Sequence, residues 1–249
     1  MVTASHNPKE YNGYKVYGPD GAQMSPEDSK IVIDTIEKIT DYTSLPVYDY
    51  DALLTEGKIV LLGDDVAEAY FTRIQRLIVN PEELKKNAEN FRLVYTPVHG
   101  TGARFVPEIL RRVGFNAVYC VEEQMRADGN FPTVPVPNPE EKGVYDLAIR
   151  LAEEKQANLL LATDPDADRT GVAVRDKDGE YVLLTGNQIG VVLLNHILSG
   201  RSASGTLPEK GFVVSTVVST RLTEEICRRY GVTYVDVLSG FKFIGEQIK

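Results

Sequence analysis

The sequence predicts an α/β protein made of tandem α/β domains with mixed, largely parallel sheets. Strand-like and helix-like segments alternate through the middle of the chain, a pattern typical of parallel sheets covered by helices. Two similar stretches, "ILRRVGFNAVYCV" (109–121) and "ICRRYGVTYVDV" (226–237), each join a helix end to a strand through a glycine, which indicates a duplicated unit. Three aspartates directly follow an apolar strand, the position where open α/β sheets bind ligands.

The first domain is expected to span residues 1–65, with a polar loop at its start and a connector at its end. A helix should begin at Ser25-Pro26, because serine caps a helix well and proline suits the first helical position. After residue 40 the hydrophobic periodicity fades, and one short strand is predicted at 58–62.

The second domain, 66–184, should open with a helix. Its predicted apolar face contains Tyr70, Ile74, Leu77 and Ile78. The elements expected next are a strand at 93–95, a helix at 104–113, a strand at 117–121, a helix at 144–154, a strand at 159–162 and a hairpin of 171–175 with 181–184. The third domain, 185–249, ends on a helix that begins at Phe241.

Composition narrows the functional class. The chain of 249 residues is 43% hydrophobic and 25% charged, as in ordinary soluble proteins. Its formal net charge of -9 argues against a nucleic-acid partner, because such surfaces need clustered Lys and Arg. Neither a run of ~20 apolar residues nor a signal-peptide pattern is present. We therefore expect no membrane partner and a cytoplasmic location.

The stretch "LLLATDPDADRTG" contains the strongest chemical signal. Asp164, Asp166 and Asp168 repel one another unless a cation lies among them, and an all-oxygen ligand set suits Mg²⁺. An EF-hand loop counted from Asp164 is excluded, because Arg169 and Arg175 occupy the positions that need Gly and Glu. A D-x-D phosphatase with Asp164 as nucleophile and a solvated acidic turn both remain open.

A second candidate is the loop "TASHNPKEYNGYK" (3–15). Ser5 is a weak nucleophile without an activating partner, and His6 is adjacent to it only in sequence. Taken alone, this loop is a polar turn. His99 in "TPVHGTG" is equally ambiguous: that loop can approach a phosphate through its backbone N–H groups, or its histidine can be structural.

Together these motifs resemble the α-D-phosphohexomutase family, the phosphoglucomutases and phosphomannomutases. The resemblance extends over all three predicted domains. The motifs occur in the family's order, as "TASHNP", "NGYK", "TPVHGTG", "DGNFPT", "PNPE", "DPDADR" and "SGFKF".

The resemblance implies a role for each candidate residue. Ser5 would carry a phosphoryl group, and Asp164, Asp166 and Asp168 with a phosphoserine oxygen would hold Mg²⁺. Lys15 and His6 would assist proton transfer, which for Lys15 requires a lowered pKa, and Arg169 would stabilise phosphoryl charge. The sugar-reading loop would consist of Ser239, Gly240, Phe241 and Lys242.

The implied reaction interconverts hexose 1-phosphate and hexose 6-phosphate through a hexose 1,6-bisphosphate. Glucose 1-phosphate is the preferred substrate, with mannose or pentose phosphates as alternatives. A non-catalytic phosphosugar-binding module is the third hypothesis, beside the mutase and the phosphatase.

The sequence also departs from the family, whose members have four domains. The start of domain I, the later half of domain III and all of domain IV have no counterpart in these 249 residues, so we expect a fragment with little mutase turnover. Sheets cut in this way would expose their edges and favour self-association.

Overall fold

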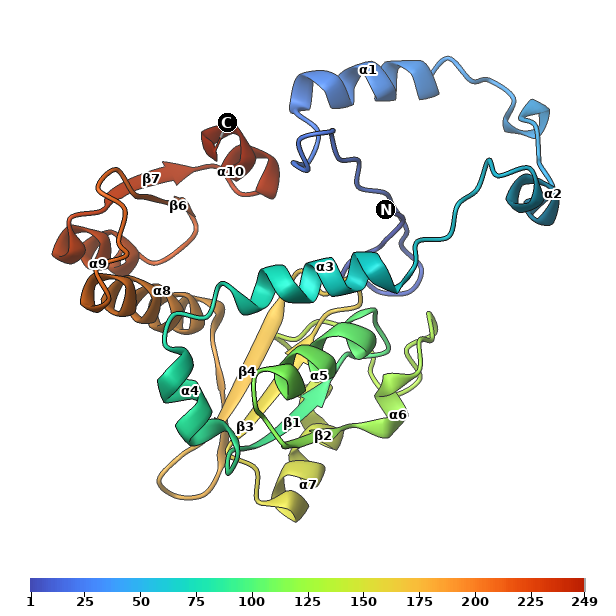
Figure 1. Cartoon of the computed structure of the whole chain (residues 1–249). Helices are drawn as coiled ribbons and strands as arrows, with labels where there is room; N and C mark the ends of the chain where they lie inside the picture. The colour runs from blue at the N-terminus through green and yellow to red at the C-terminus, as the bar shows by residue number, and fades with distance from the viewer. Residues whose placement is uncertain (249) are drawn as a thin grey trace. The chain divides into compact units, whose positions relative to one another are not determined.

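The computed structural model describes residues 1–248 (Figure 1). Its internal contacts divide the chain into two units. The first unit consists of residues 1–15 and 78–239. The second consists of residues 16–77 with those from 240 onward. The candidate loops that contain Ser5, Lys15 and Asp164 therefore all belong to the first unit.

A mixed five-stranded sheet forms the centre of the first unit, in the order β2-β1-β3-β4-β5. Strands β2, β1 and β3 are parallel, whereas β3, β4 and β5 are successively antiparallel. The strands are β1 Arg92–Thr96, β2 Ala117–Cys120, β3 Leu159–Thr163, β4 Thr170–Arg175 and β5 Tyr181–Leu184. The predicted closing hairpin is therefore present as β4 and β5, and the predicted mixed, largely parallel fold class is confirmed.

Helices connect the parallel strands. Helix α5, Gly102–Arg112, links β1 to β2 and packs against β2, while α7, Asp146–Lys155, precedes β3 and packs against β1 and β3. The connection from β1 to β2 and the connection from β2 to β3 run in opposite directions across the sheet. Because such connections are right-handed, α5 and α7 lie on opposite faces of the sheet. The shorter helices of this part are α4 Pro81–Ala88, α6 Glu122–Met125 and the 3₁₀ helix η2 Lys142–Tyr145.

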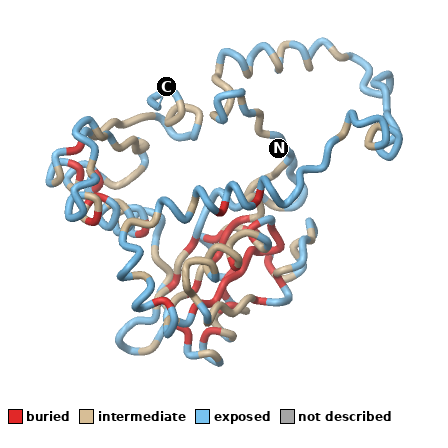
Figure 2. Tube along the Cα trace, viewed as in Figure 1, coloured by how far each residue is buried: buried red, intermediate tan, exposed pale blue. Residues whose placement is uncertain are grey.

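The core of the five-stranded sheet is made of small and branched side chains. Val94, Leu160 and Ala162 are fully buried on adjacent strands, and Ala148 of α7 is buried with them. Figure 2 shows the buried residues gathered along this sheet. The buried strands thus form a rigid support for the loops at their carboxyl ends.

A second, two-stranded parallel sheet follows the long helix α8, Gly186–Ala203. Strands β6, Phe212–Thr216, and β7, Thr233–Val237, pair in parallel around α9, Leu222–Tyr230. The joint α9–Gly231–β7 repeats α5–Gly114–β2, and both glycines have positive φ, at 67° and 111°. The two stretches that the sequence predicted to be alike therefore fold alike.

The second unit is helical in the part that the structure describes. Ser25 caps α1 as predicted, with its side chain accepting from the backbone N–H of Asp28. The elements are α1 Pro26–Ile36, the 3₁₀ helix η1 Tyr42–Ser44, α2 Tyr50–Thr55, α3 Asp64–Gln75 and α10 Phe241–Ile248.

Two predictions in this unit are wrong. Residues 58–62 form no strand, and Val60 is 74% exposed, because no neighbouring strand offers hydrogen bonds to this segment in the described chain. Helix α3 ends at Gln75 and buries Ala67 and Phe71, whereas Tyr70 of the predicted apolar face is 53% exposed. Periodicity located this helix but not the face that packs.

Candidate functional site

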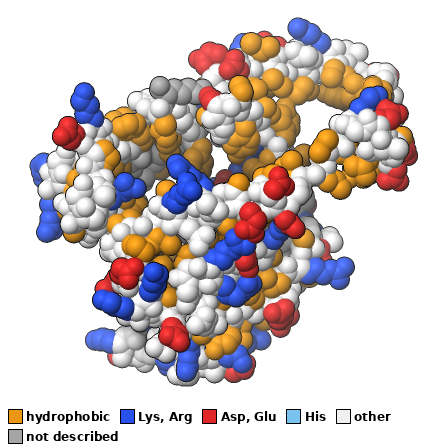
Figure 3. Space-filling model, viewed as in Figure 1, with side chains coloured by type: hydrophobic (Ala, Val, Ile, Leu, Met, Phe, Trp, Pro, Cys, Tyr) orange, Lys and Arg blue, Asp and Glu red, His pale blue; other side chains and the backbone are white. Residues whose placement is uncertain are grey.

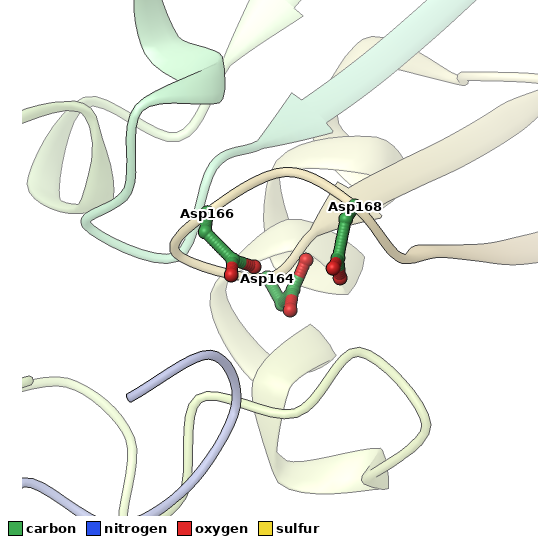
Figure 4. A group of neighbouring side chains, drawn as sticks. All are labelled: Asp164, Asp166 and Asp168. Atoms are coloured by element: carbon green, nitrogen blue, oxygen red, sulfur yellow. The ribbon is translucent and has the colours of Figure 1, made fainter. Parts of the chain in front are cut away.

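Asp164, Asp166 and Asp168 converge in the loop between β3 and β4, at the carboxyl end of β3 (Figure 4). Their ligand oxygens lie within 4.8 Å of one another. The loop turns tightly because Ala167, at φ 59°, donates its N–H to the carbonyl of Asp164 at 3.0 Å. The N–H of Arg169 donates to Asp164 Oδ1 at 2.9 Å, which fixes that carboxylate.

The amino-terminal serine loop lies directly against these aspartates. Ser5 Oγ donates to Asp164 Oδ2 at 3.2 Å, and Thr3 Oγ1 donates to Asp166 Oδ2 at 3.1 Å. Thr3 Oγ1 also accepts the N–H of Ser5 at 2.8 Å, which supports the left-handed backbone of Ser5 at φ 54°. Two loops about 160 residues apart in sequence therefore form one site.

Lys15 bridges two of the carboxylates. Its Nζ lies 2.9 Å from Asp166 Oδ2 and 2.7 Å from Asp168 Oδ2. Partial burial opposes the charged form of Lys15, but the hydrogen bonds to Asp168 and Asp166 outweigh it and raise its pKa. The lowered pKa expected from sequence is therefore wrong for this arrangement, in which the neighbours of the ammonium are anions.

The pKa values of Asp164 and Asp166 are shifted in opposite directions. Burial and the neighbouring aspartates raise the pKa of Asp164, which is fully buried. Burial also disfavours the charged form of Asp166, but hydrogen bonds from Lys15 and Asp164 outweigh it and lower the pKa of Asp166. Asp166 Oδ1 is buried without a hydrogen-bond partner. An all-oxygen cluster with one unpaired buried oxygen fits a hard divalent cation.

The remaining predicted residues are His6, Arg169 and the four residues of the sugar-reading loop. His6 Nδ1 lies 3.2 Å from Ser5 Oγ, and burial, with the Arg169 charge, lowers the pKa of His6. The Arg169 residue is exposed. Ser239 ends the first unit, whereas Gly240 lies just before α10 in the second unit, and α10 begins at Phe241 and contains Lys242.

His99 proves to be a structural histidine, the second of the two hypotheses made from sequence. It is 5% exposed, and its Nδ1 lies 2.9 Å from the carbonyl oxygen of Arg126 and its Nε2 2.8 Å from Thr133 Oγ1. The four backbone N–H groups from Val98 to Thr101 all donate to protein acceptors, so they are not available to a phosphate.

Sequence reasoning missed Thr3 and the contact between Thr101 and the loop 164–169, here called the Asp loop. Thr101 donates from its N–H and from Oγ1 to the carbonyl of Pro165, at 2.9 and 3.1 Å. The signal for Thr3 was its position two residues before Ser5, where a hydroxyl can accept the serine N–H. The Thr101 contact joins segments that only the folded chain brings together.

Comparisons with known proteins agree with this geometry. Models of the phosphoglucomutase/phosphomannomutase α/β/α domains I, II and III match residues 1–43, 68–179 and 185–249 in turn. A phosphoglucomutase of Staphylococcus aureus is 38% identical over 251 residues, which cover 100% of this chain and 43% of that protein. The chain thus spans less than half the length of this relative.

Solved structures give the same picture. A protein of Thermus thermophilus assigned as a phosphomannomutase superposes with a TM-score of 0.72 and 25% identity, over 99% of this chain and 50% of its own. An Aspergillus fumigatus N-acetylphosphoglucosamine mutase, solved with GlcNAc-6P and magnesium, shares the fold with a TM-score of 0.58 and 18% identity, over 99% of this chain and 57% of its own. The chain belongs to the phosphoglucomutase/phosphomannomutase family.

Proposed function

We propose that this chain carries the phosphoryl-transfer centre of a phosphohexomutase, with Ser5 as the residue that accepts and returns the phosphoryl group. The observation that carries the proposal is the 3.2 Å hydrogen bond from Ser5 Oγ to Asp164 inside the acidic cluster. Asp164, Asp166 and Asp168, with an oxygen on Ser5, would hold Mg²⁺, which supplies positive charge to the phosphoryl oxygens when bound.

The reaction is a reversible exchange of phosphate between Ser5 and a sugar hydroxyl. In one direction the hydroxyl oxygen bonds to phosphorus, the Ser5 Oγ–P bond breaks, and the hydroxyl proton passes to a nearby base. In the other direction Ser5 Oγ gives up its proton and bonds to a phosphorus of the bisphosphorylated sugar, the sugar O–P bond breaks, and the sugar oxygen takes up a proton. His6, whose Nδ1 lies 3.2 Å from Ser5 Oγ, is the proposed base, and Lys15 supplies fixed positive charge.

The substrate is proposed to be a hexose 1-phosphate, with a hexose 1,6-bisphosphate as intermediate. Glucose 1-phosphate is the first to test, because the Staphylococcus aureus relative is named a phosphoglucomutase. Ser239, Gly240, Phe241 and Lys242 remain proposed as the sugar-reading loop.

The phosphatase alternative fits the geometry less well. A phosphatase with Asp164 as nucleophile leaves the 3.2 Å hydrogen bond from Ser5 Oγ to Asp164 Oδ2 without a function. Such a phosphatase also gives the serine loop no chemical role.

The test is incubation with glucose 1,6-bisphosphate and Mg²⁺, followed by peptide mass spectrometry. We expect one phosphate on the peptide that contains Ser5, no phosphate in Ser5→Ala, and loss of labelling when EDTA removes the metal. Absence of phosphate on Ser5 in the wild-type chain would refute the proposal. Hydrolysis of p-nitrophenyl phosphate that survives Ser5→Ala would support the phosphatase instead.

A further inference from the structure

The loop from Thr96 to Gly102, here called the brace loop, connects β1 to α5 and has no part in the proposed chemistry. Its backbone N–H groups from Val98 to Thr101 donate to acceptors within the protein, as described above. The brace loop contacts the Asp loop at Pro165, which lies between the proposed metal ligands Asp164 and Asp166. The brace loop is therefore placed to act on the ligands through Pro165.

The contact at Pro165 is both bonded and tightly packed. Thr101 gives two hydrogen bonds to the Pro165 carbonyl, at 2.9 Å from N–H and 3.1 Å from Oγ1. Gly100 lies so near that an added Cβ would fall 2.6 Å from the Pro165 oxygen and 2.8 Å from its carbonyl carbon. No side chain fits at Gly100 unless Pro165 moves.

The other side of the brace loop is anchored by a buried hydrogen-bond chain. Thr96 Oγ1 donates to Gln124 Oε1 at 2.6 Å, and Gln124 Nε2 donates to Thr133 Oγ1 at 3.0 Å. His99 Nδ1 donates to the carbonyl oxygen of Arg126 at 2.9 Å, and its Nε2 lies 2.8 Å from Thr133 Oγ1. Each side chain in this series of hydrogen bonds has a partner, so the brace loop has little freedom to move.

A displacement of Pro165 must move its neighbours, Asp164 and Asp166. Mg²⁺ requires oxygen ligands at about 2.0–2.1 Å in near-octahedral geometry, so it tolerates little change in ligand spacing. Mutation of residues that contact metal ligands and hold them in orientation commonly changes metal affinity by roughly 10–100-fold.

We propose that the brace loop positions the Asp loop for divalent-cation binding, with Gly100 and Thr101 as positioning residues and His99 as their anchor. This inference deepens the proposed function, since it concerns the same acidic cluster. It predicts that brace-loop substitutions weaken metal binding in a chain that is still folded.

The experiment titrates the full chain with Mn²⁺, followed by electron paramagnetic resonance, and measures the melting temperature of each variant by calorimetry. Gly100→Ala should bind Mn²⁺ roughly 10-fold or more weakly than wild type. Gly190→Ala is the matched control, because a Cβ at Gly190 meets nothing within 4 Å, and it should bind as wild type.

A second pair of variants keeps the test decisive if Gly100→Ala fails to fold. Thr101→Val removes one hydrogen bond to Pro165 with little change of shape and should weaken Mn²⁺ binding, whereas Thr101→Ser should restore it. Wild-type affinity in folded Gly100→Ala, or equal affinities in Thr101→Val and Thr101→Ser, would overturn the inference.

The two proposals can fail separately. If the wild-type chain accepts phosphate on Ser5 but the folded brace-loop variants bind Mn²⁺ as tightly as wild type, the brace-loop inference is refuted and the phosphoserine proposal stands. If the variants lose Mn²⁺ affinity but Ser5 never becomes phosphorylated, the brace-loop inference stands and the mutase proposal is refuted.

Discussion

At the scale of the residue, Lys15 determines how the acidic cluster is stabilised. The Asp166 side chain is 5% exposed and that of Lys15 is 23% exposed, so water screens their 2.9 Å ion pair only partly. The same ammonium also forms an ion pair with Asp168, at 2.7 Å. Removal of Lys15 would leave three carboxylates with no nearby cation from the serine loop.

Lys15→Met is therefore expected to lower the free energy of unfolding by about 1–3 kcal/mol in metal-free buffer, the cost of leaving buried polar groups without partners. Mg²⁺ should recover more stability in this variant than in wild type, because a cation replaces the lost charge. Urea unfolding with and without Mg²⁺ measures both quantities.

The control for this prediction is Lys30→Met. The Lys30–Asp34 pair has side chains 73% and 46% exposed, so its loss should cost only about 0–1 kcal/mol. Equal losses in the two variants would contradict a special role of Lys15 in the cluster.

At the scale of the element, helix α8 shows how local sequence sets a boundary. The Thr185 side chain accepts from the N–H of Gln188, and the Gln188 side chain accepts from the N–H of Thr185, forming a complete capping box. The cap follows β5 directly, so it fixes where the first sheet ends and the segment leading to β6 begins.

Thr185→Ala should lower the free energy of unfolding by about 1 kcal/mol, because an N–H at the start of α8 loses its acceptor. Thr185→Ser retains the hydroxyl and should behave as wild type. Calorimetry or urea unfolding distinguishes the two, and a loss of the same size in Thr185→Ser would show that the methyl group rather than the cap matters.

At the scale of the whole molecule, the sheets have unpaired edges in the part of the chain that the structure describes. Strands β2 and β5 end the five-stranded sheet, and β6 and β7 each pair on one side only. Figure 3 shows hydrophobic side chains at the surface, and the exposed ones include Val182 of β5 and Phe212 of β6. None of the described helices is both long and apolar enough to cross a membrane.

We expect this chain to self-associate as its concentration rises, because open strand edges with apolar side chains pair readily. Sedimentation velocity over a range of concentrations measures this. A single monomeric species throughout would contradict the prediction. Val182→Lys, on the edge strand β5, should reduce the association if that edge mediates it.

The sequence located most elements of the fold because their signals are local. Ser25 and Pro26 mark the start of α1, and the hairpin predicted from 171–175 and 181–184 forms as β4 and β5. The strand expected at 58–62 failed because a strand exists only with a partner, and partner availability is a property of the folded chain. The predicted domain boundaries near residues 65 and 185 remain predictions.

The sequence by itself determined the chemical content of the candidate site: three alternating aspartates after a buried strand and a serine loop with a lysine. Only the tertiary structure decided that Ser5 reaches Asp164, that Lys15 is held protonated between two carboxylates, and that Thr101 supports Pro165. The physical reason is that residue type and spacing are local, whereas burial, charge neighbours and hydrogen-bond partners arise from segments that folding brings together.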